Sequence, residues 1–411
     1  MSGKGRRERE SPDVAGPASA GRRTAKVAAN PASARIEGRA SPRHRIRLKP
    51  DPQAIASDPQ PIAPGTLPGF ADRIIDWQRT HGRHDLPWQR TRDAYRIWLS
   101  EIMLQQTQVA TAIPYYLRFL DTFPDVAALA AAPLERVLEH WSGLGYYRRA
   151  HHLHAAARAV VAAHGGAFPR DAQTLASLPG VGRSTATAIA AFAFGARGAI
   201  LDGNVKRVLA RHAGIEGFPG AAKIEAELWR HAEARLPASG IEAYTQGLMD
   251  LGATVCTRTK PRCSACPIAA DCVALATGRV GELPSPRPKK PLPRRSLRLL
   301  VIERAGEILF EKRPPTGIWG GLWSLPELPL EADVAEACRR RFGVLVVPGA
   351  TLAPIEHGFT HYRLTLHPLR LRVRRAVAGA REDGIVWLAP ADAVDAALPA
   401  PIRVLLRSRV G

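Results

Sequence analysis

The chain of 411 residues is long enough for two domains with separate hydrophobic cores and an additional tail. Lysine and arginine outnumber aspartate and glutamate by 58 to 37, and this excess predicts attraction to a polyanion such as nucleic acid. The longest uncharged apolar stretch, residues 184–196, is too short to cross a bilayer, and no charged-then-apolar signal sequence opens the chain. We therefore expect a cytoplasmic, nucleoid-associated protein without a membrane partner.

Residues 1–66 are dominated by Arg, Ala, Pro, Ser and Gly, with almost no large apolar side chains to bury. Such a composition predicts a disordered, basic tail. Two interpretations of this tail remain open: it binds DNA phosphates without specificity, or it is a solvated segment with no role.

Residues 67–277 show helical periodicity with few β-branched runs, which predicts an all-α domain. One of its helices carries a single apolar stripe made by Tyr95, Trp98, Leu99, Ile102 and Met103. Glu101, Gln105 and Gln108 then fall on a different face. On this pattern alone, Glu101 would be an ordinary solvated side chain.

The stretch 178–182, Leu-Pro-Gly-Val-Gly, separates two predicted helices, 171–177 and 183–194. It predicts a helix-hairpin-helix, because Gly180 and Gly182 permit a tight turn whose backbone N–H groups can hold a phosphate. Turns of this kind also join helices that bind nothing. The motif alone therefore leaves DNA binding open.

Asp202 lies just ahead of a further predicted helix, which ends at Gly214. An aspartate in this place commonly caps the helix N-terminus, and that is its simplest role. Lys206, one turn further on, is expected to contact a phosphate.

Four cysteines are the most specific signal in the chain, with six, two and five residues between them: Cys256, Cys263, Cys266 and Cys272. Thiols this close either pair as disulfides or share a metal centre, and their clustering favours a reducing compartment. Zinc sites usually have two CxxC units, whereas only one is present, so one 4Fe-4S cluster is favoured over zinc and disulfides. Arg258 and Lys260 make this loop basic, so we expect the loop to bind DNA.

Residues 278–296, rich in Pro, Lys and Arg, predict a stiff, extended linker. Residues 297–411 combine strand-like runs with one helical stretch, which predicts an α+β domain. The expected strands are 297–303, 307–312, 363–373 and 384–388, and the expected helix is 331–342. Cys338, the fifth cysteine, is expected to be a small buried apolar residue.

Together, several of these motifs resemble one known family. The cysteine spacing, the hairpin and the stretch 201–205 (LDGNV) are similar to the helix-hairpin-helix, endonuclease III-like glycosylase superfamily. The stretches 98–109 (WLSEIMLQQTQV) and 143–148 (GLGYYR) resemble, more specifically, adenine DNA glycosylases of the MutY type. The resemblance implies a monomeric enzyme of base excision repair with one 4Fe-4S cluster. Its substrate would be double-stranded DNA containing adenine mispaired with 8-oxoguanine or guanine.

By this resemblance, Glu101 protonates adenine N7, while Asp202 stays ionised and stabilises positive charge on the sugar. The chemistry requires two carboxylates in different environments, with a pocket that raises the pKa of the acid. Gln105 and Tyr146 would fill the gap left by the flipped adenine, although Tyr146 could instead be a core aromatic. Ser184 stands where bifunctional relatives carry a lysine. Because a hydroxyl cannot form a Schiff base, a monofunctional hydrolase is predicted.

The stretch 317–323 (GIWGGLW) resembles the Nudix fold, for which Mg²⁺-dependent pyrophosphate hydrolysis is a rival function. Nudix hydrolases need a run of glutamates to hold the metal, but arginines stand here and only Glu336 remains. The resemblance implies instead that residues 359–362 (FTHY) recognise 8-oxoguanine on the opposite strand. A core position for His361 is the simpler alternative.

Two rival functions remain: a bifunctional glycosylase and lyase for pyrimidine lesions, and a catalytically silent DNA-binding or Nudix-type protein. Ser184 argues against the first, and the presence of both Glu101 and Asp202 argues against the second. The residues predicted to contact DNA are Gln105, Tyr146, Leu178, Gly180, Gly182, Ser184, Lys206, Arg258, Lys260, Phe359, Thr360 and His361.

Overall fold

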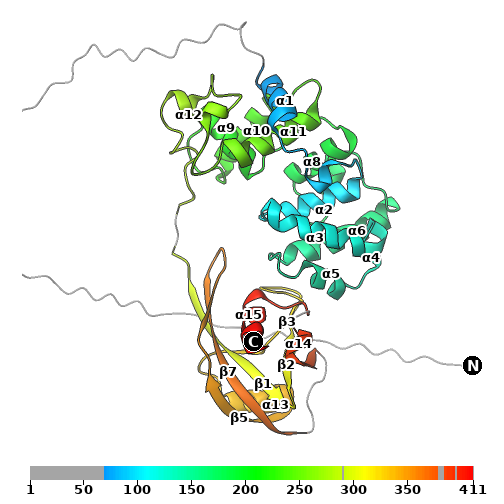
Figure 1. The fold of residues 1–411 in the computed structure, drawn as a ribbon, viewed down its shortest axis with the longest axis vertical. Coiled ribbons are helices and arrows are strands. Elements are labelled where there is room, and N and C mark those ends of the chain that lie inside the picture. Colours follow the sequence, from blue (N-terminus) through cyan, green and yellow to red (C-terminus); the bar gives the residue numbers. More distant parts are fainter. Residues whose placement is uncertain (1–68, 289–290, 378–383, 394–395, 411) are drawn as a thin grey trace, which may run out of the picture. The chain divides into compact units, whose positions relative to one another are not determined.

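The computed structural model describes residues 69–288, 291–377, 384–393 and 396–410, except for the side chains of 408–410 (Figure 1). The predicted tail lies outside the described residues, as do residues 289 and 290 of the predicted linker. Within the described part of the chain, no helix is both long and apolar enough to span a membrane.

The first group of helices packs around a core of large side chains that includes Trp98, Tyr116, Phe119 and Trp141. It consists of α2 (Ala94–Leu104), α3 (Val109–Thr122), α4 (Val126–Ala131), α5 (Leu134–Trp141), α6 (Arg148–His164), α7 (Ala172–Ala176) and α8 (Arg183–Phe194). The predicted apolar stripe of α2 is fully buried in this core, which confirms the periodicity argument.

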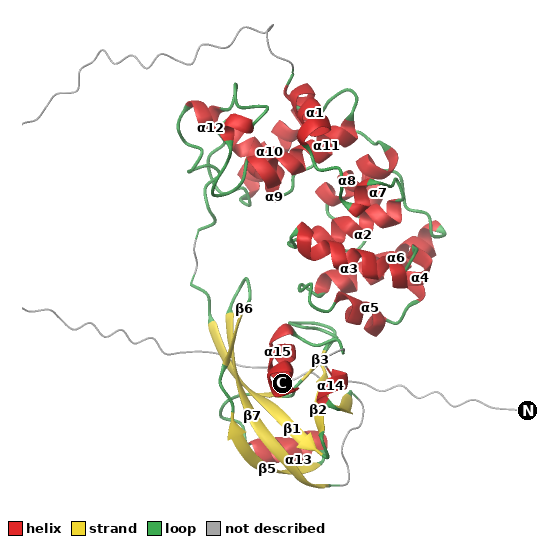
Figure 2. Ribbon diagram, in the orientation of Figure 1, coloured by secondary structure: helices red, strands yellow, loops and turns green. Residues whose placement is uncertain are grey.

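The second group contains helices from both ends of the helical region and has a core of its own, to which Ile74, Val205, Leu209 and Leu248 belong. It consists of α1 (Phe70–His81), α9 (Gly203–Ala213), α10 (Ala222–Ala234), α11 (Ile241–Asp250), the π-helical segment η2 (Leu251–Val255) and α12 (Val273–Ala276). Helix α8 contacts both α2 and α11 and so joins the two groups. The all-α prediction is confirmed for this region (Figure 2).

One expectation about α2 is wrong. The helix ends at Leu104, so Gln105 and Gln108 lie in the turn beyond it rather than on its polar face. Gln106 in this turn has a positive φ of 57°, a conformation that cannot continue a right-handed helix. The carbonyl groups at the end of the helix are bound instead by the guanidinium of Arg149.

The strands form one mixed sheet in the order β3-β2-β1-β7-β5, while β4 pairs with β1, β6 with β7 and β8 with β2. Strands β1 and β7 are parallel, and the other pairs are antiparallel. The bounds are β1 (Arg294–Arg304), β2 (Glu307–Lys312), β3 (Trp323–Ser324), β4 (Glu327–Leu328), β5 (Val344–Thr351), β6 (Ile355–Gly358), β7 (Arg363–Ala376) and β8 (Ile385–Leu388).

Alternation along β1 gives the sheet two apolar faces. Leu300 and Ile302 pack with helix α13 (Val334–Phe342), whereas Leu299 and Val301 share a core with helix α15 (Ala400–Val410). A short helix, α14 (Pro390–Ala393), precedes α15. The α+β prediction is therefore confirmed. Cys338 on α13 is fully buried in the apolar core, as expected.

Candidate active site and DNA-contacting surfaces

A cleft of about 320 Å³ opens where the two helix groups meet. Residues of α2, α3, α8 and α11 line it, together with a loop that contains the 3-10 turn η1 (Pro87–Gln89). Leu86, Trp88 and Phe192 give part of the lining an apolar character, and Glu101 lies among them. This volume is in the range of sites that enclose a small organic group.

The environment of Glu101 keeps its carboxyl group neutral at ordinary pH. Burial raises the pKa of Glu101 to about 8, and the negative charge of Asp202 adds to the effect. Glu101 therefore holds a proton at neutral pH and can donate it inside the cleft. The influence of Asp202 on this pKa also means that the two carboxyl groups are close in space.

Asp202 occupies the N-cap of α9, where its Oδ1 accepts a hydrogen bond of 2.7 Å from the backbone N–H of Val205. Burial raises the pKa of Asp202, but the N–H groups of Val205 and Asn204 and the charge of Arg207 oppose this effect. These contacts favour the ionised form of Asp202, whereas no donor to the carboxyl group of Glu101 is present among the described residues. The capping role expected from sequence is confirmed.

Ser184 and Lys206 both make contacts inside the protein. The backbone N–H of Leu201 donates a hydrogen bond of 2.9 Å to Ser184 Oγ, which fixes the segment that leads to Asp202. Lys206 Nζ donates to Glu225 Oε1 at 2.7 Å. The ammonium group of Lys206 is thus ion-paired within the protein, and its contact with a phosphate stays a prediction.

Gln105 and Tyr146, the predicted gap-filling residues, lie on neighbouring turns. Gln105 Nε2 donates to the carbonyl of Gly180 at 3.3 Å, which connects the turn after α2 to the hairpin. The Tyr146 side chain is 48% exposed, so it is not a core aromatic. The Arg149 guanidinium lies 5.5 Å from the centre of the Tyr146 ring and supports it from the protein side.

No pattern in the sequence singles out Arg149, yet it connects the two segments that carry these side chains. Its buried guanidinium donates to the carbonyls of Ile102, Met103 and Gln105 at the end of α2, and to those of Leu144 and Gly145 in the second turn. It also donates to Thr107 Oγ1 at 3.0 Å. The only available signal was its place directly after GLGYYR in the sequence.

The hairpin has the predicted form. Gly180 has a φ of +76°, and a Cβ atom there would lie 2.7 Å from the Cβ of His152. Gly182 is the N-cap of α8, and no side chain makes the capping hydrogen bond. The N–H groups that begin α8 can therefore bind an anion. Leu178 is buried, so only its backbone could take part.

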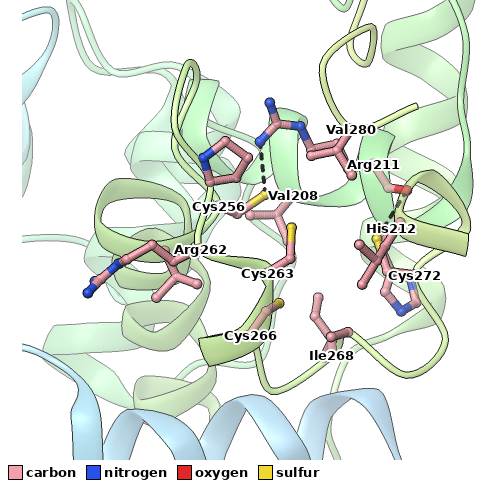
Figure 3. Close-up of a pocket in the computed structure, with 14 residues that line it drawn as sticks. Val208, Arg211, His212, Cys256, Arg262, Cys263, Cys266, Ile268, Cys272 and Val280 are labelled. Carbon is pink, nitrogen blue, oxygen red and sulfur yellow. Dashed lines mark hydrogen bonds between the residues drawn. The ribbon is translucent and has the colours of Figure 1, made fainter. Parts of the chain in front are cut away.

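The four clustered cysteines are free thiols, which excludes disulfides between them in this structure. All four line one cleft whose other walls are mostly apolar, including Val208, Val255 and Ile268 (Figure 3). Arg211 stands at the rim, where its Nη1 donates to Cys256 Sγ at 3.4 Å. Among the described residues, no group of three or more His, Cys, Asp and Glu is arranged to hold a metal ion.

Helix α9 connects this loop to the site of the carboxylates. Arg207 donates to the carbonyl of Cys256 at 2.7 Å, and Arg211 donates to that of Thr257 at 2.7 Å. The 3-10 turn η3 (Cys263–Ala265) lies within the loop, and Arg258 and Lys260 on the same loop are exposed. The loop therefore presents positive charge to solvent.

The residues 359–362 form the turn between β6 and β7, closed by a hydrogen bond of 2.9 Å from the N–H of Phe359 to the carbonyl of Tyr362. The two rings stack with centroids 4.7 Å apart, and Tyr362 is buried. Thr360 and His361 are exposed at the tip. His361 is therefore not a core histidine.

Helix α13, where a Nudix hydrolase would bind its metal, carries ion pairs instead. Glu336 pairs with Arg339 at 2.9 Å, and Arg341 pairs with Glu311 on β2 at 2.6 Å. Glu336, the one remaining glutamate of the predicted metal site, is thus paired within the protein.

Comparison with known proteins agrees with this description. The family model of the HhH-GPD superfamily base excision DNA repair protein matches residues 99–234, and a NUDIX domain model matches residues 298–408. The solved structure of a thermostable thymine-DNA glycosylase covers 51% of this chain and 95% of its own, at 30% identity and a TM-score of 0.47. The two family models, together with the helical and mixed-sheet fold, define a base excision repair protein of the helix-hairpin-helix class with a Nudix domain.

The curated relatives define the family more closely. The adenine DNA glycosylase of Buchnera aphidicola subsp. Acyrthosiphon pisum (strain APS) is 33% identical over 340 residues, covering 82% of this chain and 97% of the relative. That of Mus musculus is 34% identical over 398 residues, covering 82% of this chain and 77% of the relative. The chain belongs to the adenine DNA glycosylase family, whose members are hydrolases of the N-glycosyl bond.

Proposed function

We propose that this protein is a monofunctional DNA glycosylase that removes adenine mispaired with 8-oxoguanine or guanine. The observation that carries the proposal is a protonated Glu101 in the lining of the cleft, close enough to Asp202 for the charge of Asp202 to raise its pKa. The names of the relatives, adenine DNA glycosylase, indicate which nucleobase is removed, and the two carboxyl groups indicate how the N-glycosyl bond is broken.

In the proposed reaction, Glu101 donates its proton to N7 of the adenine as the C1′–N9 bond breaks. The bonding electrons leave with the base, which departs neutral because it has gained this proton. The positive charge that develops on the sugar is stabilised by the Asp202 carboxylate. Water then adds to C1′, and the Glu101 carboxylate accepts the proton that the water releases.

The adenine has to leave the helix before it can enter the cleft, which costs a few kcal/mol. The exposed Tyr146 ring and the Gln105 amide are placed on neighbouring turns from which they can fill the vacated space. The N–H groups of Gly180 and Gly182 would hold a nearby phosphate without sensing sequence.

The contacts of Ser184 and Lys206 support a monofunctional enzyme. A lyase needs a free amine to attack the sugar. The Ser184 hydroxyl instead holds the N–H of Leu201, and the Lys206 amine is paired with Glu225. We therefore expect an abasic site as the product, with the strand intact.

We propose that the four cysteines of this loop hold one 4Fe-4S cluster. Four free thiols line a single apolar cleft, and Arg211 at its rim complements the negative charge of thiolate-bound iron and sulfur. When bound, the cluster would cross-link the loop 256–272, so that Arg258 and Lys260 are held out towards DNA phosphates. A broad visible absorption that disappears in a Cys266→Ser variant would identify iron, whereas a colourless, zinc-containing sample would contradict the assignment.

In the C-terminal domain, the tip of the β6–β7 turn is the proposed contact with 8-oxoguanine. Thr360 and His361 are exposed and offer hydrogen bonds, while the stacked ring of Phe359 supports the turn from below. We further propose that the two domains span 67–277 and 297–411 with the linker 278–296 between them. The protein would act as a monomer in the cytoplasm.

The test uses duplexes with adenine opposite 8-oxoguanine, analysed with and without alkali. Release of adenine with breaks only after alkali supports the proposal. Breaks without alkali would show a lyase, and no base release would show a silent protein. The Glu101→Gln variant should lose base release while keeping duplex affinity. Glu242→Gln is the matched control, because Glu242 lines the same cleft but pairs with Arg92 at 2.8 Å.

A further inference from the structure

The guanidinium of Arg149 is divided between two separate segments, the turn after α2 and the turn before α6. Its Nη1 donates only to carbonyls of the first segment, those of Ile102 (3.2 Å), Met103 (2.8 Å) and Gln105. Its Nη2 donates to both segments, to Thr107 Oγ1 (3.0 Å) and to the carbonyls of Leu144 (3.4 Å) and Gly145 (3.3 Å). Because the guanidinium is planar and rigid, it fixes the position of one turn relative to the other.

Each of these turns contains a residue in the left-handed backbone region. Gln106 has a φ of 57° and Tyr146 has a φ of 49°. Residues with a side chain rarely adopt this conformation, and it persists only where the surrounding contacts hold it. Arg149 binds directly beside both residues, at Gln105 and at Gly145. The backbone conformations of the two turns thus depend on the same side chain.

The guanidinium of Arg149 also contacts two aromatic rings. It lies 5.3 Å from the centre of the Trp141 ring, which is fully buried, and 5.5 Å from the centre of the exposed Tyr146 ring. Trp141 Nε1 in turn donates to the carbonyl of Gly145 at 3.1 Å. The Tyr146 ring is therefore supported by a group that cannot shift without disturbing the turn that carries Gln105.

Two side chains can enter the gap left by a flipped base independently or together. If the turns that carry them move independently, the effects on binding of removing the two side chains multiply. If a rigid connection joins the turns, the loss of one side chain also reduces the contribution of the other, and the effects do not multiply.

We infer that Arg149 is a positioning residue that makes Gln105 and Tyr146 enter the gap as one unit. The inference rests on the proposed function, in which these two side chains fill the space of the flipped adenine. It adds that a buried residue joins them into a single wedge, although they belong to separate segments of the chain.

The test is a double-mutant cycle on binding to a duplex with 2′-fluoro-2′-deoxyadenosine opposite 8-oxoguanine. The fluorine disfavours positive charge on the sugar, so the base stays in place during the titration. The readout is the dissociation constant of a fully paired duplex divided by that of this duplex, so that unspecific phosphate contacts cancel. Gln105→Ala and Tyr146→Ala are measured singly and together. We expect the loss in the double variant to be at least about threefold smaller than the product of the two single losses.

Arg149→Lys then tests the connection itself. A lysine keeps the charge, but its ammonium group can hold only one of the two turns. In this background the loss in the double variant should equal the product of the single losses. Arg148→Lys, at the exposed neighbouring position, is the matched control and should leave the cycle as in the wild type. If Arg149→Lys does not fold, Thr107→Val takes its place, because it removes only one hydrogen bond of Nη2, and should bring the loss closer to the product.

Two results would overturn the inference while the proposed function stands. One is a loss in the wild-type cycle that equals the product of the single losses. The other is a threefold difference that stays unaltered in Arg149→Lys, or in Thr107→Val where that variant replaces it. If neither Gln105→Ala nor Tyr146→Ala lowers the ratio, the gap-filling role in the proposed function is itself refuted, and the inference with it.

Discussion

The protonation of Glu101 makes a quantitative prediction about the dependence of base release on pH. With a pKa of about 8, Glu101 is roughly 90% protonated at pH 7 and roughly 10% protonated at pH 9. A glutamate with the ordinary pKa of 4.5 would be only about 0.3% protonated at pH 7. Burial in the cleft thus increases the amount of active acid at pH 7 by a factor of about 300.

The measurement is the single-turnover rate of adenine release between pH 6 and 9.5, with duplex affinity determined separately at each pH. We expect a plateau below pH 7, half of the maximal rate near pH 8, and a tenfold fall for each further pH unit. A rate that is constant to pH 9.5, or that is already half-maximal at pH 5, would refute the assignment of Glu101 as the acid.

The same pKa has a consequence for stability that provides a second readout. A carboxyl whose folded-state pKa is raised stabilises the protein fully below its unfolded pKa of 4.5, and this contribution is lost as the pH rises through about 8. Between these pH values the folded protein must keep Glu101 protonated, which lowers its stability. Glu101→Gln removes this cost, so the variant should unfold at a higher temperature than the wild type at pH 7 and at the same temperature at pH 4. The upper bound at pH 7 is about 3.5 kcal/mol, from the 2.5 pH units between pH 4.5 and pH 7 at about 1.4 kcal/mol each.

Three further substitutions test other parts of the site. Asp202→Asn keeps an oxygen for the cap, so we expect unfolding within about 1 kcal/mol of wild type in denaturant but adenine release at least about a hundredfold slower. Arg149→Met leaves several buried carbonyls unpaired and should lower the free energy of unfolding by about 3 to 5 kcal/mol in the same denaturant assay. Arg148 is exposed, so Arg148→Met should change the free energy of unfolding by less than about 0.5 kcal/mol. Gly180→Ala, with its close contact and positive φ, should cost about 1 to 3 kcal/mol and weaken duplex binding in a filter or anisotropy titration. A Cβ atom at Gly182 would meet nothing within 4 Å, so the Gly182→Ala variant should fold normally.

Elements with strong local signals could be predicted from the sequence. Helix α8 begins and ends where the pattern after the hairpin predicts, and β2 has the expected bounds. The short strands β3 and β4 were not predicted, because each has only two residues and exists through its pairing with β2 or β1. Such pairing is long-range and leaves no periodic pattern in the sequence.

The candidate site was predictable only in part, for a similar physical reason. Glu101 and Asp202 belong to motifs that resemble a known family, and their roles follow from that resemblance. Arg149 belongs to no motif, since its partners come from two other segments of the chain, 102–107 and 144–145. Burial of a charged group is decided by the folded surroundings, and an arginine on a helix looks the same in sequence whether it is buried or solvated.

The roles of the two carboxylates cannot be exchanged in this fold. Asp202 accepts the hydrogen bond from Val205 N–H that begins α9, and the N-terminal end of this helix favours a negative charge. Protonation of Asp202 would weaken that bond and so disturb the helix whose arginines hold the cysteine loop. Among the described residues, Glu101 has no donor to its carboxyl group, and only burial and the charge of Asp202 act on its pKa. The proton therefore resides on Glu101, and the enzyme can transfer it to a base without altering the start of α9.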